Sequence, residues 1–147
     1  MKWLLIFLPL ACWGCIHLND CKNQDCFTPP PDIRFELVDS ATLENLFQSG
    51  VLPEDPVSIT DEQDDPVACT LYKQYGPWAV WSSELGWRMG SHHYTLTVGD
   101  SLHVTFTLNM ETVEAECCTF FSIKSFTVDN YSYSGDPVSG FVRVLIP

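Results

Sequence analysis

The 147-residue sequence has few basic residues and no long hydrophobic run. It carries 7 Lys and Arg side chains against 19 Asp and Glu, which gives a formal net charge of −12. Nucleic-acid binding needs clustered Lys and Arg, so this composition argues against nucleic acid as a partner. The same shortage of positive charge argues against electrostatic docking on anionic lipid headgroups. The longest apolar stretch, residues 3–11, is much shorter than the roughly 20 residues of an ordinary membrane-spanning helix.

The motifs of several common enzyme classes are also missing. The sequence has no Gly-x-Ser-x-Gly nucleophile elbow, no His-Glu-x-x-His zinc motif and no glycine-rich phosphate loop. No cysteine lies in a recognisable nucleophile motif. We therefore predict that the protein is not an enzyme, with no catalytic residues and no cofactor. Hydrophobic residues nevertheless make up 46% of the chain, which is too high a share for a disordered protein.

The first fifteen residues have the pattern of an export signal. One positive charge precedes the short apolar core at residues 3–11, and small residues precede two cysteines. A cysteine directly after a small residue resembles the lipobox of bacterial lipoproteins, in which that cysteine is acylated and becomes the new N-terminus. Cys15, after Gly14, is the predicted acylation site, and Cys12, after Ala11, is the alternative. A plain secretory signal that is cut elsewhere is the competing interpretation.

Acylation would hold the mature chain at a membrane. Each buried methylene of an acyl chain such as palmitate contributes roughly 0.8 kcal/mol, so two or three chains give a stable anchor. The sequence then predicts a signal peptide at residues 1–14, a Pro-terminated tether at 15–31 and one domain at 32–147. Ile16 after the predicted acylation site is not acidic, so an inner-membrane retention signal of that kind is absent. The predicted location is the cell envelope, at the outer membrane.

Five cysteines follow the predicted acylation site: Cys21, Cys26, Cys69, Cys117 and Cys118. An oxidising compartment favours disulfides, and an odd count leaves at least one thiol unpaired. We expect the tether cysteines Cys21 and Cys26 to be the ones joined to Cys117 and Cys118, in a connectivity that stays open. Cys69 is then free and buried. Zinc held by four thiolates is the competing interpretation, which adjacent ligands and an oxidising compartment disfavour.

Short segments rich in Val, Ile, Thr, Phe and Tyr follow the prolines of the tether. The predicted strands are residues 33–39, 57–60, 67–73, 78–82, 93–98, 101–109, 119–129 and 140–146. Gly99–Asp100 is typical of a tight hairpin turn, and residues 40–47 form either a turn or a short helix capped by Ser40. About eight closely spaced strands predict an all-β fold, a single antiparallel β-sandwich of the immunoglobulin-like or transthyretin-like kind.

Four short motifs follow one another along the mature chain. They are Cys-Phe-Thr-Pro-Pro at 26–30, Phe-Glu-Leu-Val-Asp at 35–39, Glu-Asn-Leu-Phe at 44–47 and Cys-Cys at 117–118. In this order they resemble a group of small lipoproteins from Bacteroidetes-type bacteria. The resemblance implies an exported lipoprotein with a β-domain and no particular activity. It covers Cys26, Cys117 and Cys118, which supports a disulfide between tether and domain. Residues 40–43 depart from the Lys/Thr-Gly turn of that group.

Aromatic residues are concentrated between residues 72 and 87. Trp78, Trp81, Trp87 and Tyr75 could form a platform for a sugar or an anchor in a protein interface, although aromatic residues more often pack in cores. These four are the predicted ligand surface. The functional prediction is a non-catalytic envelope lipoprotein with a binding or structural role. Its predicted partners are the membrane, through the acyl chains, and an envelope protein or a glycan.

Two further features favour a small metal-dependent hydrolase as the alternative. The acidic segment 61–65 offers oxygen ligands for calcium, but its spacing is not that of an EF-hand, and such charge runs are commonly solvated loops. His92 and His93 precede the hairpin turn and His103 follows it, so His93 and His103 could approach each other. A metal needs a third ligand, which the sequence does not identify, and we predict no metal site.

Overall fold

The structure is a computed structural model that describes residues 26, 28–115 and 117–147. The predicted signal peptide, the candidate acylation sites Cys12 and Cys15, and the tether cysteine Cys21 lie outside the described residues. No membrane-spanning helix is found in the part of the chain that the structure describes.

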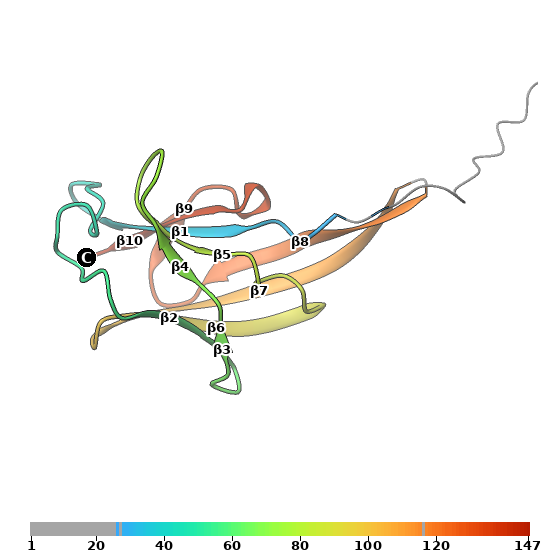
Figure 1. The fold of residues 1–147 in the computed structure, drawn as a ribbon, viewed down its shortest axis with the longest axis horizontal. Helices are drawn as coiled ribbons and strands as arrows, with labels where there is room; N and C mark the ends of the chain where they lie inside the picture. The colour runs from blue at the N-terminus through green and yellow to red at the C-terminus, as the bar shows by residue number, and fades with distance from the viewer. Residues whose placement is uncertain (1–25, 27, 116) are drawn as a thin grey trace, which may run out of the picture.

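Among the described residues, ten strands in two sheets form a β-sandwich (Figure 1). Sheet A has the order β4 (Thr70–Tyr72), β5 (Ala79–Ser82), β1 (Ile33–Asp39), β10 (Phe141–Ile146) and β9 (Ser132–Ser134). Sheet B has the order β3 (Pro66–Val67), β2 (Val57–Asp61), β6 (Gly90–Val98), β7 (Leu102–Ala115) and β8 (Cys118–Val128). A short 3-10 helix, η2 (Pro137–Ser139), precedes β10. The predicted all-β sandwich is confirmed, with ten strands in place of about eight.

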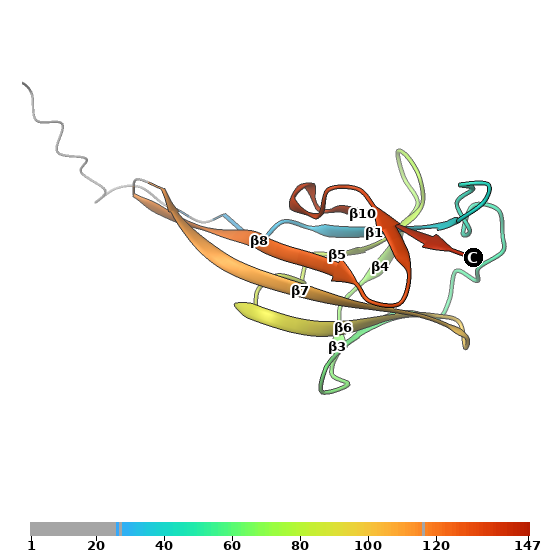
Figure 2. The same cartoon turned by 180° about the vertical axis from the view of Figure 1, so that it is seen from behind.

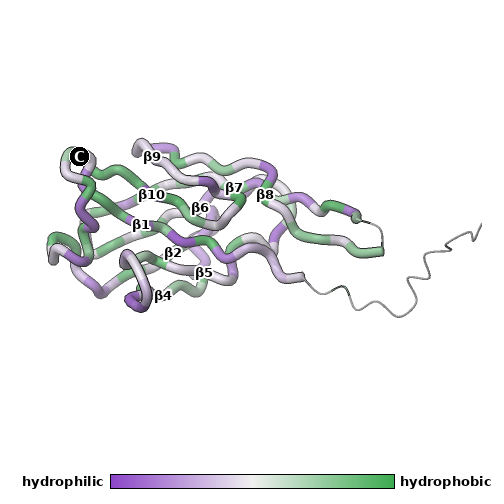
Figure 3. Tube along the Cα trace, turned by 90° about the horizontal axis from the view of Figure 1, so that it is seen from above, coloured by the Kyte–Doolittle hydropathy of each residue, from purple (hydrophilic) through white to green (hydrophobic). Residues whose placement is uncertain are grey.

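Alternating sequence patterns explain the strands that line the core. In β7, Leu102, Val104, Phe106 and Leu108 are buried, and the residues between them are more exposed. Successive side chains of a strand point to opposite faces, so this alternation directs one face inward. The ring of Phe35 in β1 lies 4.7 Å from that of Phe106, centroid to centroid, which joins the two sheets across the core. Figure 3 shows hydrophobic and hydrophilic residues interleaved along the strands.

One pair of strands is parallel. β1 and β10 run side by side from Arg34 opposite Phe141 to Asp39 opposite Ile146. Every other strand pair of the described residues is antiparallel. Two parallel neighbouring strands require a long connection in the sequence. Here β1 and β10 are the first and the last strand along the described chain. The C-terminal strand therefore lies inside sheet A, next to the first strand.

The segment 67–73 differs from the prediction of one continuous strand. β3 ends at Val67 in sheet B, and β4 begins at Thr70 in sheet A. The chain changes sheets at Ala68 and Cys69 between them. Cys69 is the only free cysteine among the described residues, as predicted, but it is half-buried and not fully buried.

Residues 40–47 form a series of turns and no helix. Asp39 organises the first turn, because its Oδ1 accepts hydrogen bonds from the backbone N–H groups of Ala41 and Thr42 at 2.9 and 2.8 Å. Hydrogen bonding of this kind lets an aspartate initiate a turn. Leu46 and Phe47 then become buried, so the segment closes one end of the sandwich.

The hairpin of β7 and β8 extends beyond the rest of sheet B. β6 ends its pairing with β7 where Gly90 lies opposite Met110, whereas the pairing of β7 with β8 continues to Ala115 opposite Cys118. Figures 1 and 2 show this extension at one end of the long axis, with the C-terminus toward the other end. The sequence predicts that the strand corresponding to β7 ends at residue 109, whereas β7 ends at Ala115.

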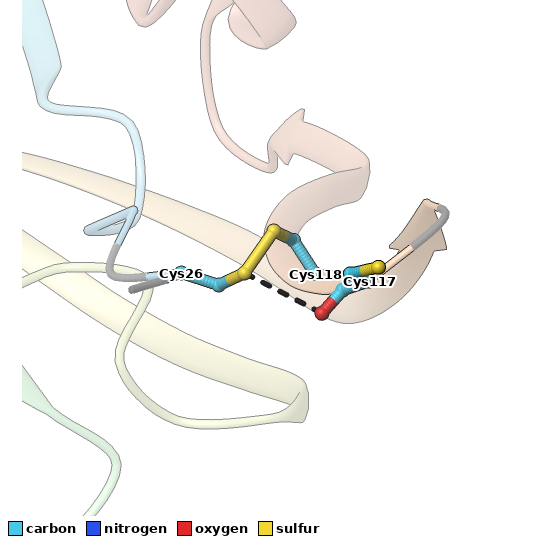
Figure 4. Close-up of a disulfide and its surroundings, with 3 residues drawn as sticks. All are labelled: Cys26, Cys117 and Cys118. Carbon is cyan, nitrogen blue, oxygen red and sulfur yellow. Dashed lines mark hydrogen bonds between the residues drawn. A yellow bond between two sulfur atoms is a disulfide. The ribbon is translucent and has the colours of Figure 1, made fainter. Parts of the chain in front are cut away.

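A disulfide attaches the tether to the tip of this hairpin. Cys26 is bonded to Cys118, with Cα atoms 5.2 Å apart and a sequence separation of 92 positions (Figure 4). This is one of the pairings that the sequence left open. Cys26 Sγ also lies 3.4 Å from the carbonyl oxygen of Cys117, a contact and not a hydrogen bond because a disulfide sulfur carries no proton. Cys117 is itself disulfide-bonded, and its partner is not among the described residues.

The end of the tether packs against the sandwich. Pro30 is buried, and a Cβ placed on Gly86 would lie 3.0 Å from the Pro30 Cβ and 3.2 Å from the Met110 Cε. Gly86 also has φ +93°, a conformation that favours glycine. The proline segment therefore lies against the β5–β6 connection at Gly86, which also approaches Met110 of β7.

Candidate functional site

The four aromatic residues of the predicted ligand surface have different surroundings. Tyr75 is 98% exposed in the loop between β4 and β5. Trp78 is half-buried against the core, and the Lys73 ammonium lies 4.9 Å from the centre of its ring. Trp87 is 43% exposed, and its indole Nε1–H donates a hydrogen bond to the carbonyl of Ser83 at 3.0 Å. Trp81 is the one that lies in a hollowed part of the surface.

Trp81 lies on the face of sheet A that points away from the core. Its neighbour Val80 is fully buried and faces inward, opposite the buried Phe35 of β1. Side chains alternate along a strand, so Trp81 and its cross-strand partner Arg34 share the outer face. Thr70 of β4 is the partner of Trp81 on the other side. The sheet thus brings three residues from three separate strands into one row.

Two adjoining hollows surround Trp81. One has a volume of about 160 Å³ and is lined by Ala68, Cys69, Thr70, Trp81 and Ser83. The other has a volume of about 110 Å³ and is lined by Asp32, Arg34, Tyr72 and Trp81. We call the two together the Trp81 cleft. Ligand pockets for whole small molecules commonly measure at least 300 Å³, so the Trp81 cleft has room for one group of a larger ligand.

The indole N–H of Trp81 has no hydrogen-bond partner. Its Nε1 is the only buried side-chain nitrogen or oxygen of the described residues that lacks one. Leaving a buried donor unsatisfied costs about 1–3 kcal/mol, and native structures contain few such groups. Trp81 therefore has a buried donor that no described group satisfies, on a side chain that lines two hollows.

Arg34 is the only lysine or arginine among the described residues without a carboxylate in salt-bridge range. The others are paired: Lys73 with Glu54, Arg88 with Asp61 and Glu62, Lys124 with Glu111, and Arg143 with Glu36. The guanidinium carbon of Arg34 lies 5.9 Å from the centre of the Tyr72 ring, at the outer limit of a cation–π contact. The chain has a net charge of −12, so the exposed guanidinium of Arg34 is a positive group without a carboxylate partner on a mostly acidic protein.

Cys69 contributes a thiol of low reactivity to the cleft. Burial raises the pKa of this thiol, and its Sγ lies 3.9 Å from the carbonyl oxygen of Val57, toward which it can donate a weak hydrogen bond. The thiolate is the nucleophilic form of cysteine, so a raised pKa reduces the reactive fraction at neutral pH. Cys69 is therefore suited to line the hollow and poorly suited to attack a substrate.

The predicted approach of His93 and His103 is wrong. In the β6–β7 hairpin His93 lies opposite Thr107, and His103 lies opposite Thr97. The two histidines are thus separated by four residues along the strands, which corresponds to roughly 14 Å. Each Nδ1 lies within hydrogen-bond range of the opposite threonine hydroxyl, at 2.9 Å for His93 and 3.1 Å for His103.

The acidic loop is engaged by cationic side chains. Arg88 Nη1 donates to Asp61 Oδ2 at 2.8 Å, and its Nη2 donates to Glu62 Oε1 at 3.2 Å. His92 Nδ1 lies 3.0 Å from the same Glu62 oxygen, and its Nε2 lies 2.9 Å from the carbonyl of Met89. The hydrogen bond from His92, together with the charge of Arg88, lowers the pKa of Glu62 to about 2.

These contacts fasten the β2–β3 loop to the connection between β5 and β6. Asp61 Oδ1 also accepts backbone N–H groups of Gln63 and Asp65, so this carboxylate is used inside its own loop. Within residues 26, 28–115 and 117–147, no group of three or more His, Cys, Asp or Glu side chains is placed to hold a metal ion.

The comparisons with protein-family models, with curated proteins and with solved structures found no match for this chain.

The sequence predicts Trp81 as a ligand residue and places Tyr72 in the same aromatic stretch, but it gives no indication that Asp32 and Arg34 lie beside them. Arg34 occupies an outward position in the predicted strand 33–39, which is the one local signal that it is exposed. Its contact with Trp81 depends on the pairing of β1 with β5, across 47 positions of sequence, and no motif announces that pairing.

Proposed function

We propose that this protein is a non-catalytic, exported lipoprotein that holds a β-sandwich binding module at a membrane surface and uses the Trp81 cleft to bind its ligand. The cleft is the observation that carries the proposal. It combines an unsatisfied indole donor, an unpaired guanidinium and two aromatic rings next to hollows large enough for a ligand group. Such a combination of apolar surface and a few unsatisfied polar groups is typical of binding sites.

The Cys26–Cys118 disulfide supports the exported and tethered part of the proposal. Disulfides persist in oxidising compartments, so this bond indicates a location outside the cytoplasm. Only 11 positions separate Cys26 from the proposed acylation site Cys15, a span of at most roughly 40 Å. An acylated Cys15 would thus keep the hairpin tip close to the membrane. Trp81 would lie on the side of the sandwich, on a sheet face that the anchor leaves open.

The proposed hydrolase alternative has less support. His93 and His103 are far apart and each is hydrogen-bonded to a threonine. Two of the four carboxylates in the acidic segment 61–65, those of Asp61 and Glu62, are engaged by Arg88 and His92. The polar groups around Trp81 contain no nucleophile paired with a base, because the only thiol there has a raised pKa. A binding role therefore fits the site better than a hydrolytic one.

The anchor is tested by expressing the full chain in a bacterial host that processes lipoproteins. We expect the protein to fractionate with membranes, and we expect Cys15→Ser to abolish acylation and to release the protein. Cys12→Ser is the matched control and keeps acylation. A wild-type chain that is exported without acyl chains would overturn the lipoprotein proposal. Loss of acylation in Cys12→Ser but not in Cys15→Ser would identify Cys12 as the acylation site.

The ligand site is tested with the same protein on arrays of envelope glycans and against envelope protein extracts. We expect Trp81→Ala to reduce any specific binding at least tenfold and Tyr75→Ala to leave it unchanged, because Tyr75 is exposed and lines neither hollow. Equal binding by wild type and Trp81→Ala would show that the cleft is not the binding site.

A further inference from the structure

Resting on the proposed function, we propose that the Trp81 cleft recognises a sugar that carries a carboxylate, that is, a uronic acid unit of an acidic glycan. Arg34 would bind the carboxylate. Trp81 would donate its indole N–H to an oxygen of the same unit, which reaches this buried nitrogen by displacing the atoms that cover it. Asp32 would accept hydrogen bonds from the sugar hydroxyls. The rings of Trp81 and Tyr72 would contact the apolar C–H face of the sugar.

The charge of Arg34 selects an anionic group. A guanidinium presents its N–H donors in a planar fork that matches both oxygens of a carboxylate. The other described lysines and arginines already have carboxylate partners within the chain. Arg34 is thus the cation available for a partner from outside. Its position on the strand β1, between β5 and β10, fixes it better than a loop would.

The indole N–H of Trp81 is a second donor, and it favours a ligand that carries many hydrogen-bond acceptors. Indole nitrogen can only donate, and the Trp81 Nε1–H is buried without a partner. The hollows are also lined by Thr70, Ser83 and Tyr72, whose side chains carry hydroxyl groups. A hydrocarbon ligand would leave these groups unpaired, and an amine or other cation would be repelled by Arg34.

Asp32 makes the site favour an acidic sugar over an anion without hydroxyl groups. Asp32 lines the same hollow as Arg34 and carries a carboxylate, so a multiply charged anion such as phosphate would meet like charge there. A uronic acid carries one negative charge and several hydroxyl donors on the same ring. It can place its carboxylate on Arg34 and its hydroxyls on Asp32 at once. Hollows of about 160 and 110 Å³ suit one sugar unit of a chain better than a whole oligosaccharide.

The test uses the full mature chain labelled with ¹⁵N and follows the indole N–H resonance of Trp81 by NMR. Trp81→Phe identifies the resonance, because it removes that one signal. D-galacturonate and D-glucuronate are titrated in parallel with D-galactose and D-glucose, which have CH₂OH in place of the carboxylate. Acetate and inorganic phosphate are titrated as plain anions. We expect saturable shifts with at least one uronate and at least tenfold weaker binding of its neutral counterpart.

Arg34→Ala is expected to weaken uronate binding at least tenfold, and Arg34→Lys to restore only part of it because an ammonium lacks the planar fork. Lys124→Ala removes another exposed cation and serves as the matched control with unchanged binding. Thermal unfolding of each variant checks that it is folded.

The outcomes separate this inference from the proposed function. Equal binding of uronates and neutral sugars at Trp81 would overturn the carboxylate inference and keep the cleft as a glycan site. Equal binding of acetate or phosphate and uronates would reduce the site to an anion site and overturn the sugar inference. Absence of any Trp81 shift with uronates would overturn it as well. In that case a ligand lost in Trp81→Ala on the envelope screen would still support the proposed function.

Discussion

Glu36 and Arg143 lie opposite each other on the parallel strands β1 and β10, and the Arg143 Nε donates a hydrogen bond to Glu36 Oε2 at 2.7 Å. Glu36 is buried, on the face of sheet A that looks away from the core. The segment after β1 covers it, with Asn45 Nδ2 at 3.5 Å from its Oε1. The first and last strands of the domain are therefore joined by a charged pair as well as by backbone hydrogen bonds.

Breaking this pair is expected to destabilise the fold. Arg143→Ala leaves a buried carboxylate without its cation, which should lower the free energy of unfolding by about 2 kcal/mol, since the arginine side chain is partly exposed. Lys124→Ala removes a surface pair of 3.6 Å and should cost less than about 1 kcal/mol. Urea denaturation measures both values. Similar losses in the two variants would argue against a structural role for the buried pair.

The losses of stability in Gly86→Ala and Gly50→Ala are expected to differ, and the difference reports the packing of the tether. At Gly86 φ is +93° and a Cβ would press on Pro30 and Met110. Gly50 has φ +76° and open space around it, so Gly50→Ala reports backbone strain alone, at about 1 kcal/mol. The loss in Gly86→Ala should exceed that in Gly50→Ala by at least about 1 kcal/mol, again from urea denaturation. Equal losses would mean that the proline segment does not pack as described.

The contribution of Glu62 to stability should depend on pH. Because the pKa of Glu62 is lowered from 4.5 to about 2 in the folded chain, its carboxylate stabilises the fold above pH 4.5. That stabilisation is lost as the pH falls from 4.5 toward 2. Wild type should thus be more stable than Glu62→Gln at pH 6 and lose this advantage near pH 2, as followed by thermal unfolding. A difference that stays constant over this range would contradict the contacts with Arg88 and His92.

The thiol of Cys69 should react slowly with iodoacetamide in the folded protein. Burial and a raised pKa both reduce the exposed thiolate, so we expect alkylation at pH 7.5 at least tenfold slower than in urea. Mass spectrometry of the labelled peptide gives the two rates. Comparable rates would show that the larger hollow opens or that the thiol is ionised, and either result would change the chemistry proposed for the cleft.

The strands that line the core could be predicted because one of their faces is buried and the other is polar. The predicted bounds of the strand Ile33–Asp39 are the observed ones, and the predicted strand 101–109 covers the buried residues of β7 from Leu102 to Leu108. The outer part of the hairpin could not be predicted from alternation. Residues 112–115 are exposed whichever way they point, so burial imposes no pattern on them.

The pairing of strands that are distant in the sequence could not be predicted from local sequence patterns. The change of sheet at Ala68 and Cys69 interrupts a stretch that has the composition of one strand. The neighbours of Trp81 depend on the order of strands in sheet A, and the separation of His93 from His103 depends on hairpin register. Sequence analysis therefore found the aromatic residue of the cleft and missed the charged residues beside it.

The central claim, a binding module tethered at its hairpin tip, is tested most directly by the mass of the N-terminal peptide. The protein is isolated from a bacterial host, digested without reduction, and analysed again after reduction. We predict a peptide that begins at an acylated Cys15 and is linked through Cys26 to the peptide that contains Cys118, with the link removed by reduction. An N-terminal peptide without acyl chains, together with a Cys26 thiol that alkylates freely before reduction, would contradict the account.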